Sequence, residues 1–241
     1  AEELEPSGLR LLARKGVPMF EEKWVLDPKV EAPGRFPRTS PILMHDLNGD
    51  GLSEIILAGC NLVYHNKGNF QFEKGDFLSH GIRQPMEAGI LGDFNGDGHP
   101  DLMARKPDGG LMLWSGNGQG GFLGAPRRIG SGWKGFTSVV GSGDFSGDRR
   151  ADVIARTASG LLYLYPGNGS GGWLPPRLIG QGWNMFSTIT SSGDFNGDGK
   201  SDLFGRGRDG TLWMYAGNGA GGFLQREAVG TEWNMFSTIL P

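Results

Sequence analysis

An acidic phrase interrupted by glycine occurs four times in this 241-residue chain. The copies begin at Asp46, Asp93, Asp144 and Asp194, which lie 47, 51 and 50 residues apart, and they read DLNGDGLSE, DFNGDGHPD, DFSGDRRAD and DFNGDGKSD. Each copy places side-chain oxygens at alternate positions around a sharp turn. Ca²⁺ takes roughly six to eight such hard oxygen ligands in proteins. The phrase therefore predicts up to four bound calcium ions with a structural role.

Positions one, three, five and nine of the phrase are expected to supply side-chain oxygens, and position seven a backbone carbonyl. Glycines inside the phrase allow the positive φ that a tight loop needs. The third loop is expected to be the weakest, because Ser146 replaces Asn and Arg149 stands where the other copies have glycine. The predicted ligand sets are Asp46, Asn48, Asp50, Leu52 and Glu54; Asp93, Asn95, Asp97, His99 and Asp101; Asp144, Ser146, Asp148, Arg150 and Asp152; and Asp194, Asn196, Asp198, Lys200 and Asp202.

The EF-hand is the obvious alternative for such a loop, and the sequence argues against it. An EF-hand loop carries a bidentate Glu at position twelve and lies between two helices. Position twelve is occupied here by Leu57, Ala104, Ala155 and Gly205. The segments that follow, such as ADVIART and PDLMARK, are short apolar runs typical of strands. Four acidic surface turns that bind no metal are the remaining alternative.

The phrase D-x-N-G-D-G-x-x-D-L between two strands resembles the FG-GAP and VCBS repeats of integrin-type β-propellers. The resemblance covers essentially the whole chain from about Leu9 onward. It implies that the acidic loop joins the first and second strands of a propeller blade and binds Ca²⁺ there. The FG-GAP words themselves are absent from the chain, so the resemblance does not imply integrin-like function.

The repeats also indicate the architecture. Each of the last three contains the acidic loop, a strand, a turn, an aromatic strand, G-N-G-x-G-G, a short strand and a G-W-x-x-F element. This amounts to about four strands, the content of one blade. The expected repeats are approximately 1–44 (partial), 45–91, 92–142, 143–192 and 193–241. Close similarity among the last three fits either recent duplication or an engineered chimera.

The two ends of the chain are expected to complete each other. Residues 8–40 match only the later part of a repeat, and the chain stops at FSTILP, where another acidic loop would begin. Pairing of the N- and C-terminal segments would close a ring and leave no unpaired strand edge. The prediction is an all-β, five-bladed propeller of four-stranded blades that forms one domain over residues 1–241.

Composition and charge argue against several classes of function and point to an extracellular protein. The formal net charge is −3, and twelve of the 26 acidic residues lie in the four loops, so the acidity is local. No basic stripe suggests nucleic-acid binding. No stretch resembles a membrane span or a retained signal peptide. Because Cys60 is the chain's single cysteine, an intrachain disulfide is excluded. Bound calcium is then the more natural means of stabilising an extracellular protein. We expect a secreted monomer.

The G-W-x-x-F element admits two interpretations. Its tryptophans could pack between neighbouring blades, or they could offer ring faces to a sugar. The element is similar to the repeat end of five-bladed tachylectin-type lectins, which favours the second interpretation. Two of the tryptophans are followed by an asparagine that could bind a sugar hydroxyl or acetamido group. The candidate ligand-binding residues are Trp133, Trp183, Asn184, Trp233 and Asn234.

Two other chemistries find little support. G-N-G-Q-G-G, which begins at Gly116, fits a dinucleotide-binding pattern but leads into a strand, so we interpret it as a hairpin. The four histidines follow no metal spacing and match no nucleophile pattern. We therefore expect no enzymatic activity, and we expect a calcium-stabilised binding module with a carbohydrate as its ligand. The alternatives are a protein-interaction or adhesion scaffold, and the propeller domain of a secreted polysaccharide-active enzyme.

Overall fold

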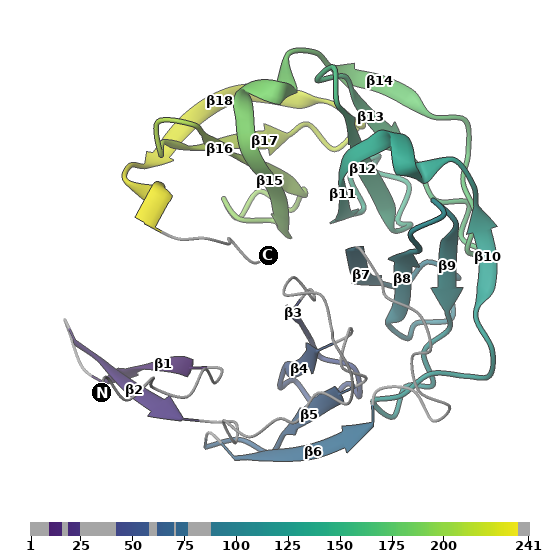
Figure 1. Cartoon of the computed structure of the whole chain (residues 1–241), viewed down its shortest axis with the longest axis vertical. Coiled ribbons are helices and arrows are strands. Elements are labelled where there is room, and N and C mark those ends of the chain that lie inside the picture. Colours follow the sequence, from purple (N-terminus) through teal and green to yellow (C-terminus); the bar gives the residue numbers. More distant parts are fainter. Residues whose placement is uncertain are drawn as a thin grey trace, which may run out of the picture.

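The chain folds into four-stranded antiparallel sheets arranged as the blades of a β-propeller (Figure 1). The computed structural model describes residues 10–15, 19–24, 42–57, 62–69, 71–76 and 88–235. The first blade contains β3 (Ile42–His45), β4 (Glu54–Leu57), β5 (Leu62–Asn66) and β6 (Phe72–Asp76); the second contains β7 (Ala88–Gly92), β8 (Asp101–Arg105), β9 (Leu111–Trp114) and β10 (Arg127–Gly130). The third contains β11 (Phe136–Gly143), β12 (Asp152–Thr157), β13 (Leu162–Tyr165) and β14 (Arg177–Gly180); the fourth contains β15 (Phe186–Gly193), β16 (Asp202–Gly207), β17 (Leu212–Gly217) and β18 (Phe223–Gly230).

Within every blade the strands follow chain order from the centre of the ring outward. Figure 1 shows β3, β7, β11 and β15 toward the centre and β6, β10, β14 and β18 at the rim. Each acidic loop connects the innermost strand of a blade to the second strand, as the resemblance implied. A blade therefore starts one strand before the acidic loop, so the blades are offset by one strand from repeats counted from the loop.

The structure confirms the propeller and its four-stranded blades, and it shows four such blades. A fifth, two-stranded sheet is formed by β1 (Arg10–Lys15) and β2 (Met19–Trp24). Figure 1 places this hairpin on the remaining side of the ring. The C-terminal segment 236–241, which we expect to close a fifth blade, lies outside the described residues, as does Cys60. Closure by the two ends therefore stays a prediction.

The hydrophobic core lies between successive blades. One buried cluster joins Leu43 and Ile56 of the first blade to Leu102 and Trp114 of the second. Two further clusters join the second blade to the third and the third to the fourth in the same way. Each sheet thus covers a face of its neighbour, which removes apolar side chains from water on both sides.

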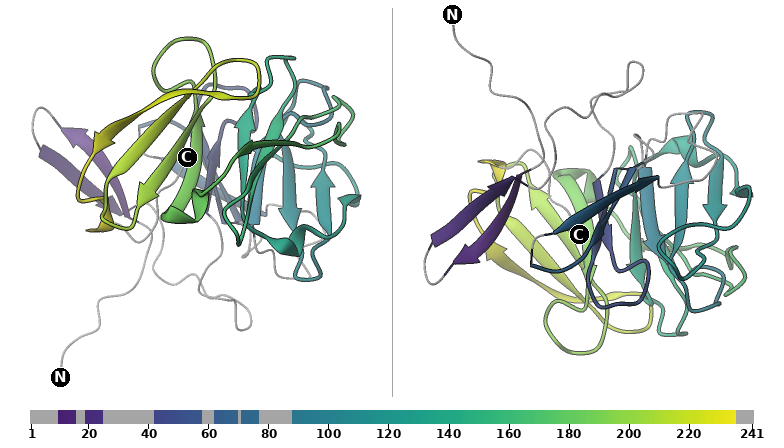
Figure 2. Two further views of the ribbon diagram at one scale, coloured as in Figure 1. Left: turned by 90° about the horizontal axis from the view of Figure 1, so that it is seen from above. Right: turned by 90° about the horizontal axis from the view of Figure 1, so that it is seen from below.

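The connections between strands lie on two opposite faces of the ring (Figure 2). One face carries the acidic loops together with the G-N-G-x-G-G hairpins, which join the third and fourth strands of the last three blades. In the part of the chain that the structure describes, the opposite face carries the turns between the second and third strands and three one-turn 3₁₀-helices. These are η2 (Trp133–Gly135), η3 (Trp183–Met185) and η4 (Trp233–Met235), and η2 and η3 each lead into the innermost strand of the following blade. We call the two sides the acidic-loop face and the tryptophan face.

Candidate functional site

The acidic loops are held in shape by their own polar side chains. In the second blade, the backbone N–H groups of Gly96 and Gly98 donate to the two carboxylate oxygens of Asp93, at 2.7 and 3.0 Å. The N–H of Asp97 donates to Asn95 Oδ1 at 2.8 Å. The other three loops repeat the bonds to position one. The side chains at positions one and three of this loop thus accept hydrogen bonds from the backbone of their own turn.

The acid at position nine has a different role from the residues at positions one, three and five. It is fully buried in every loop, where Glu54, Asp101, Asp152 and Asp202 have 0% exposed surface. The backbone N–H groups of Phe94 and Asn95 donate to Asp101 Oδ2, and that of Gly116 donates to Asp101 Oδ1 at 2.9 Å. Position nine therefore ties the loop to the end of the third strand. Burial raises the pKa of Asp101 and Asp152, and these hydrogen bonds act in the opposite direction.

The first loop departs from this arrangement because its ninth position is a glutamate. The N–H of Leu47 donates to Glu54 Oε2 at 2.8 Å. The other oxygen of Glu54 is buried and has no hydrogen-bond partner among the described residues. The longer side chain therefore does not reproduce the bond that Asp101, Asp152 and Asp202 each accept from a glycine N–H at the end of the third strand.

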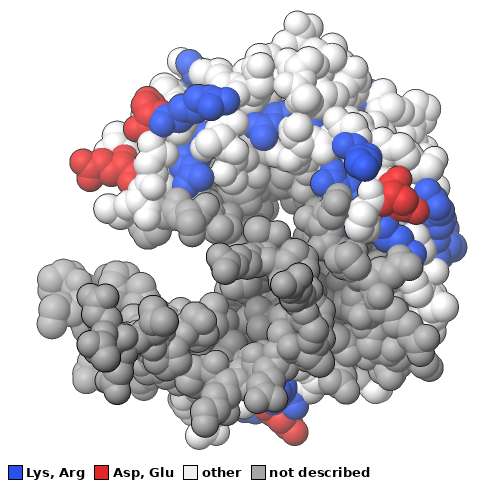
Figure 3. Space-filling model, viewed as in Figure 1, with Lys and Arg blue, Asp and Glu red and all other residues white. Residues whose placement is uncertain are grey.

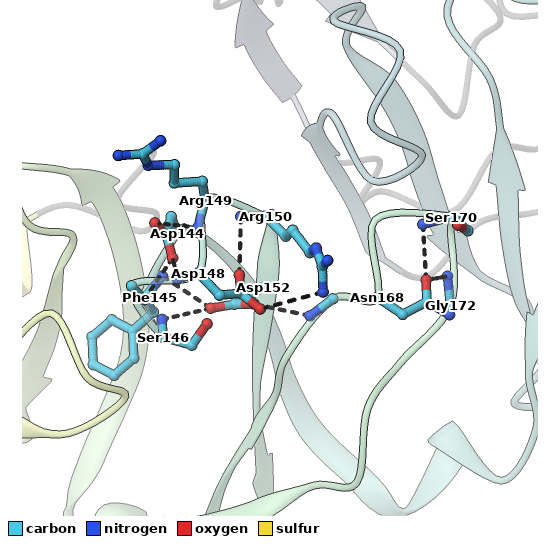
Figure 4. Close-up of polar contacts among 12 residues, drawn as sticks. Asp144, Phe145, Ser146, Asp148, Arg149, Arg150, Asp152, Asn168, Ser170 and Gly172 are labelled. Carbon is cyan, nitrogen blue, oxygen red and sulfur yellow. Dashed lines mark hydrogen bonds and ion pairs between the residues drawn. The ribbon is translucent and has the colours of Figure 1, made fainter.

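The third loop carries the strain that its sequence predicts. Arg149 has φ +66°, while its equivalents Gly51, Gly98 and Gly199 have φ between +81° and +84°. Figure 4 shows the Arg149 side chain pointing away from the carboxylates, with Asp152 between the loop and the neighbouring hairpin of its own blade. An L-residue other than glycine is disfavoured in this left-handed region. The prediction of a positive φ at this position is confirmed.

The loops offer the oxygen chemistry that Ca²⁺ requires, but they do not form a ready-made cluster of acids. The side-chain oxygens at positions one, three, five and nine, with the carbonyl at position seven, are the predicted ligands that would hold an ion. Within the described part of the chain, no three His, Cys, Asp or Glu side chains form a group able to hold a metal. Basic side chains at position seven also lie near position five, with Arg150–Asp148 at 3.8 Å and Lys200–Asp198 at 3.9 Å.

The glycine runs predicted to be hairpins are confirmed as such, and they also join neighbouring blades. The N–H of Gly171 in the third blade donates to the carbonyl of Phe94 in the second at 2.7 Å, and Gly221 donates to Phe145 at 2.9 Å. A side chain at Gly147 would collide with the carbonyl of Gly219. The glycines therefore allow the hairpins of the third and fourth blades to dock on the acidic loop of the preceding blade.

On the tryptophan face, burial favours the packing interpretation of the repeated tryptophans. Trp133 and Trp183 are only 4% and 5% exposed. The ring of Trp183 lies 4.5 Å from Tyr215 and 5.3 Å from Phe186, measured between centroids, and Trp133 has the same relation to Tyr165 and Phe136. These two tryptophans are part of the core and have almost no surface left for stacking on a sugar. Trp233 is partly buried.

The asparagines that follow two of these tryptophans remain exposed. Asn184 lies over Gly160, and Asn234 lies over Gly210, both in the turn between the second and third strands. The amide nitrogen of Asn234 donates to the carbonyl of Arg208 at 2.9 Å. The candidate ligand residues are thus divided between buried rings and exposed amides at the blade junctions.

An arginine near the end of the second strand in the second, third and fourth blades was not predicted from the sequence. It joins the second strand of one blade to the segment that leads into the next blade, because Nη1 donates to the carbonyl of the first residue of the 3₁₀-helix and, for Arg105 and Arg156, also to that of the residue after the helix. Arg105 donates to Trp133 and Phe136, Arg156 to Trp183 and Phe186, and Arg206 to Trp233, with distances of 2.7 to 3.1 Å. The repeated words DLMAR, DVIAR and DLFGR were the available signal.

Comparison with known proteins shows the family of this chain. The FG-GAP-like repeat matches three overlapping stretches, at residues 46–104, 93–155 and 144–204. The chain belongs to the FG-GAP-like repeat family. It is also similar to integrin alpha-PS5 of Drosophila melanogaster, with 32% identity over 97 residues that cover 33% of this chain and 10% of the integrin.

Two solved structures share the fold. A lectin from Agrocybe aegerita, described as recognising non-reducing terminal N-acetylglucosamine, matches 94% of this chain with 21% identity and a TM-score of 0.64. The BP39L lectin from Burkholderia pseudomallei matches 86% with 19% identity and a TM-score of 0.53. The chain spans 61% and 60% of those two chains and a tenth of the integrin. None of the described helices is long and apolar enough to cross a membrane.

Proposed function

We propose that this FG-GAP-like propeller is a secreted, non-enzymatic carbohydrate-binding module that calcium stabilises through up to four acidic loops. The observation that carries the proposal is the shared fold with two lectins, one of which is described as binding terminal N-acetylglucosamine. At this level of identity the shared fold does not identify the sugar. An extracellular location is supported by the similarity to an integrin alpha chain. We propose that five blades, completed by the two chain ends, form the ring.

The sugar would bind at the blade junctions of the tryptophan face. The exposed amides of Asn184 and Asn234 are the polar groups offered there, and Met185 supplies a half-exposed apolar surface beside the first of them. The buried Trp183 would support Asn184 and Met185 from below. Repetition of the junction would allow several weak sites to act together on one multivalent glycan.

The experiment is a glycan array with the intact chain in Ca²⁺ and in chelator, followed by titration of the best sugar. Replacing both Asn184 and Asn234 by alanine is expected to weaken binding about tenfold. Gln119→Ala, on the acidic-loop face, is the matched control and should leave binding unchanged. A protein that is fully folded by circular dichroism and binds no glycan would reject the proposal.

A second candidate function is a protein-interaction or adhesion scaffold. It is favoured by the 32% identity to an integrin alpha chain. The same array separates the two candidates, because an adhesion scaffold would bind a protein partner in the absence of any glycan and would be insensitive to competing free sugars.

A further inference from the structure

The hairpin between the third and fourth strands of the third blade carries a complete acceptor sequence for N-linked glycosylation. The hairpins of the last three blades share the word G-N-G-x-G-G and differ at its fourth residue, which is Gln119, Ser170 or Ala220. The acceptor pattern is an asparagine followed two residues later by serine or threonine, with any residue except proline between them. Asn168-Gly169-Ser170 is the single stretch of the 241-residue chain that meets this requirement.

The fold uses one atom of the Asn168 amide group and leaves the other free. Oδ1 accepts from the backbone N–H groups of Ser170 at 2.9 Å and Gly172 at 3.0 Å, and Figure 4 shows both bonds at the tip of the hairpin. Nδ2 donates to no group of the described residues, and it is not one of their buried, unpartnered atoms. The nitrogen that would carry a glycan is therefore open to solvent.

The hairpin is anchored to the second blade through its backbone, so the side chains of the acceptor sequence are available. The N–H of Gly171 donates to the carbonyl of Phe94 at 2.7 Å, and Arg127 Nη2 donates to the carbonyl of Ser170 at 2.8 Å. The side chain of Ser170 is exposed, and its hydroxyl makes no hydrogen bond to a described residue. The fold thus leaves unused both the hydroxyl that the acceptor pattern requires and the nitrogen that receives the sugar.

Modification of Asn168 would preserve the two hydrogen bonds that shape the hairpin. A lipid-linked oligosaccharyl diphosphate would supply the glycan. The bond between C1 of its first sugar and the diphosphate oxygen breaks, a bond from C1 to Nδ2 forms, Nδ2 loses one proton, and the lipid diphosphate leaves. The product is still an amide, so Oδ1 can still accept from Ser170 and Gly172. The folded hairpin therefore accommodates the modified side chain without rearrangement.

We propose that Asn168 is N-glycosylated when the chain passes through a secretory pathway, and that the glycan projects from the acidic-loop face. The proposed sugar sites at Asn184 and Asn234 lie on the opposite, tryptophan face. Figure 3 shows the ring from a side with few acidic side chains over the described blades, as expected of the tryptophan face. A glycan on Asn168 would leave that face uncovered. This inference rests on the proposed secretion and does not depend on which ligand the propeller binds.

Cell-free translation with endoplasmic-reticulum microsomes tests the inference on the full chain behind an added signal peptide. Protease-protected chains are expected to carry one glycan, seen as a mass excess that peptide:N-glycosidase removes and that peptide mapping assigns to Asn168. Ser170→Ala should abolish the modification. This variant is expected to fold normally, because the fourth blade has Ala220 at the equivalent place. Ser170→Thr is the matched control and should retain the glycan.

A gain of modification provides the stricter test. Ala220→Ser completes the acceptor sequence at Asn218, whose Oδ1 accepts from Ala220 and Gly222 at 2.8 and 3.0 Å in the same way. It should add a second glycan. Enzymatic removal of the glycans should leave the melting temperature unchanged, because the hairpin bonds do not involve Nδ2. A protease-protected wild-type chain without a glycan, or a modification that survives Ser170→Ala, would overturn the inference.

The glycan array separates this inference from the proposed function. The glycosylated chain and Ser170→Ala should bind the same sugars with the same affinity, because the modified hairpin lies on the face opposite the proposed sites. A glycosylated chain with a blank array would reject carbohydrate binding alone. A chain that binds sugars but stays unmodified in the microsomes would reject glycosylation alone, since the added signal peptide makes that test independent of the natural location.

Discussion

The third and fourth blades have almost the same sequence but differ in what covers them. Phe145, which follows the first aspartate of the third acidic loop, is 1% exposed beneath the hairpin of the fourth blade, whereas the equivalent Phe195 is 60% exposed. Trp183 is 5% exposed between the third and fourth blades, whereas Trp233 is only partly buried. Because the residue types match, the difference comes from the neighbouring blade. A blade supplies apolar faces, but only the next blade can bury them.

The tryptophan pair gives the largest expected contrast. Truncation of a core tryptophan costs about 3 to 5 kcal/mol, so Trp183→Ala should lower the free energy of unfolding by about 4 kcal/mol. Trp233→Ala should cost less than half as much, because that ring is only partly buried. Denaturant titration of both variants measures the difference. If Trp183→Ala abolished glycan binding and left stability unchanged, the buried-core interpretation would be wrong.

The phenylalanine pair tests whether the far side of the fourth blade is covered in solution. Phe145→Ala should cost about 3 kcal/mol, because the ring is fully enclosed and lies 5.2 Å from Phe223. Phe195→Ala should cost less than about 1 kcal/mol, as expected for a largely exposed side chain. Equal costs would indicate that a closing blade covers Phe195 in solution. That result would support closure of the ring by the two chain ends.

Features that depend on nearby residues could be predicted from the sequence, and features that depend on the neighbouring blade could not. The alternation of acids and glycines, the hairpin signals and the 50-residue period are local patterns, and they predicted the loops, the strands and the propeller. The buried role of position nine was not evident, because it depends on an N–H group fifteen residues away. The arginine contacts span 27 to 31 residues and cross to the next blade. Contacts of that range depend on how blades stack, which no local pattern encodes.

Calcium should matter at covered and uncovered junctions alike, since all four loops carry an aspartate at positions one and five and another acid at position nine. An ion that binds only the native state stabilises it by about 2.7 kcal/mol per site at a hundredfold excess over Kd. We expect the melting temperature to fall markedly in chelator and to recover when Ca²⁺ is restored. The control is Mg²⁺ at the same concentration, which is expected to restore less, because it demands tighter octahedral geometry. An unchanged melting temperature in chelator would exclude a structural role for calcium.

The smallest expected effects come from Arg149 and Glu232. Each replaces a glycine that the other repeats have at its own position. Arg149 has φ +66° in the covered third loop, and Glu232 has φ +64° beside the partly buried Trp233, where the other copies have Gly132 and Gly182. Glycine relieves the strain of a positive φ by about 1 kcal/mol. Arg149→Gly should therefore raise the free energy of unfolding by about that amount. Glu232→Gly should raise it less, because the adjoining Trp233 is only partly buried.

Calcium affinity distinguishes the effects of Arg149→Gly and Glu232→Gly. Arg149→Gly also removes a positive charge from a loop of three acids, so it should tighten the calcium site there as well as stabilise the fold. Glu232→Gly lies on the tryptophan face and should leave calcium affinity unchanged. Gly98→Ala is the converse control: a Cβ at that position, with φ +83°, would meet no atom within 4 Å, so any loss reports backbone strain alone. If Gly98→Ala were neutral, strain could not be the reason for a gain at Arg149, and removal of the charge would have to account for it.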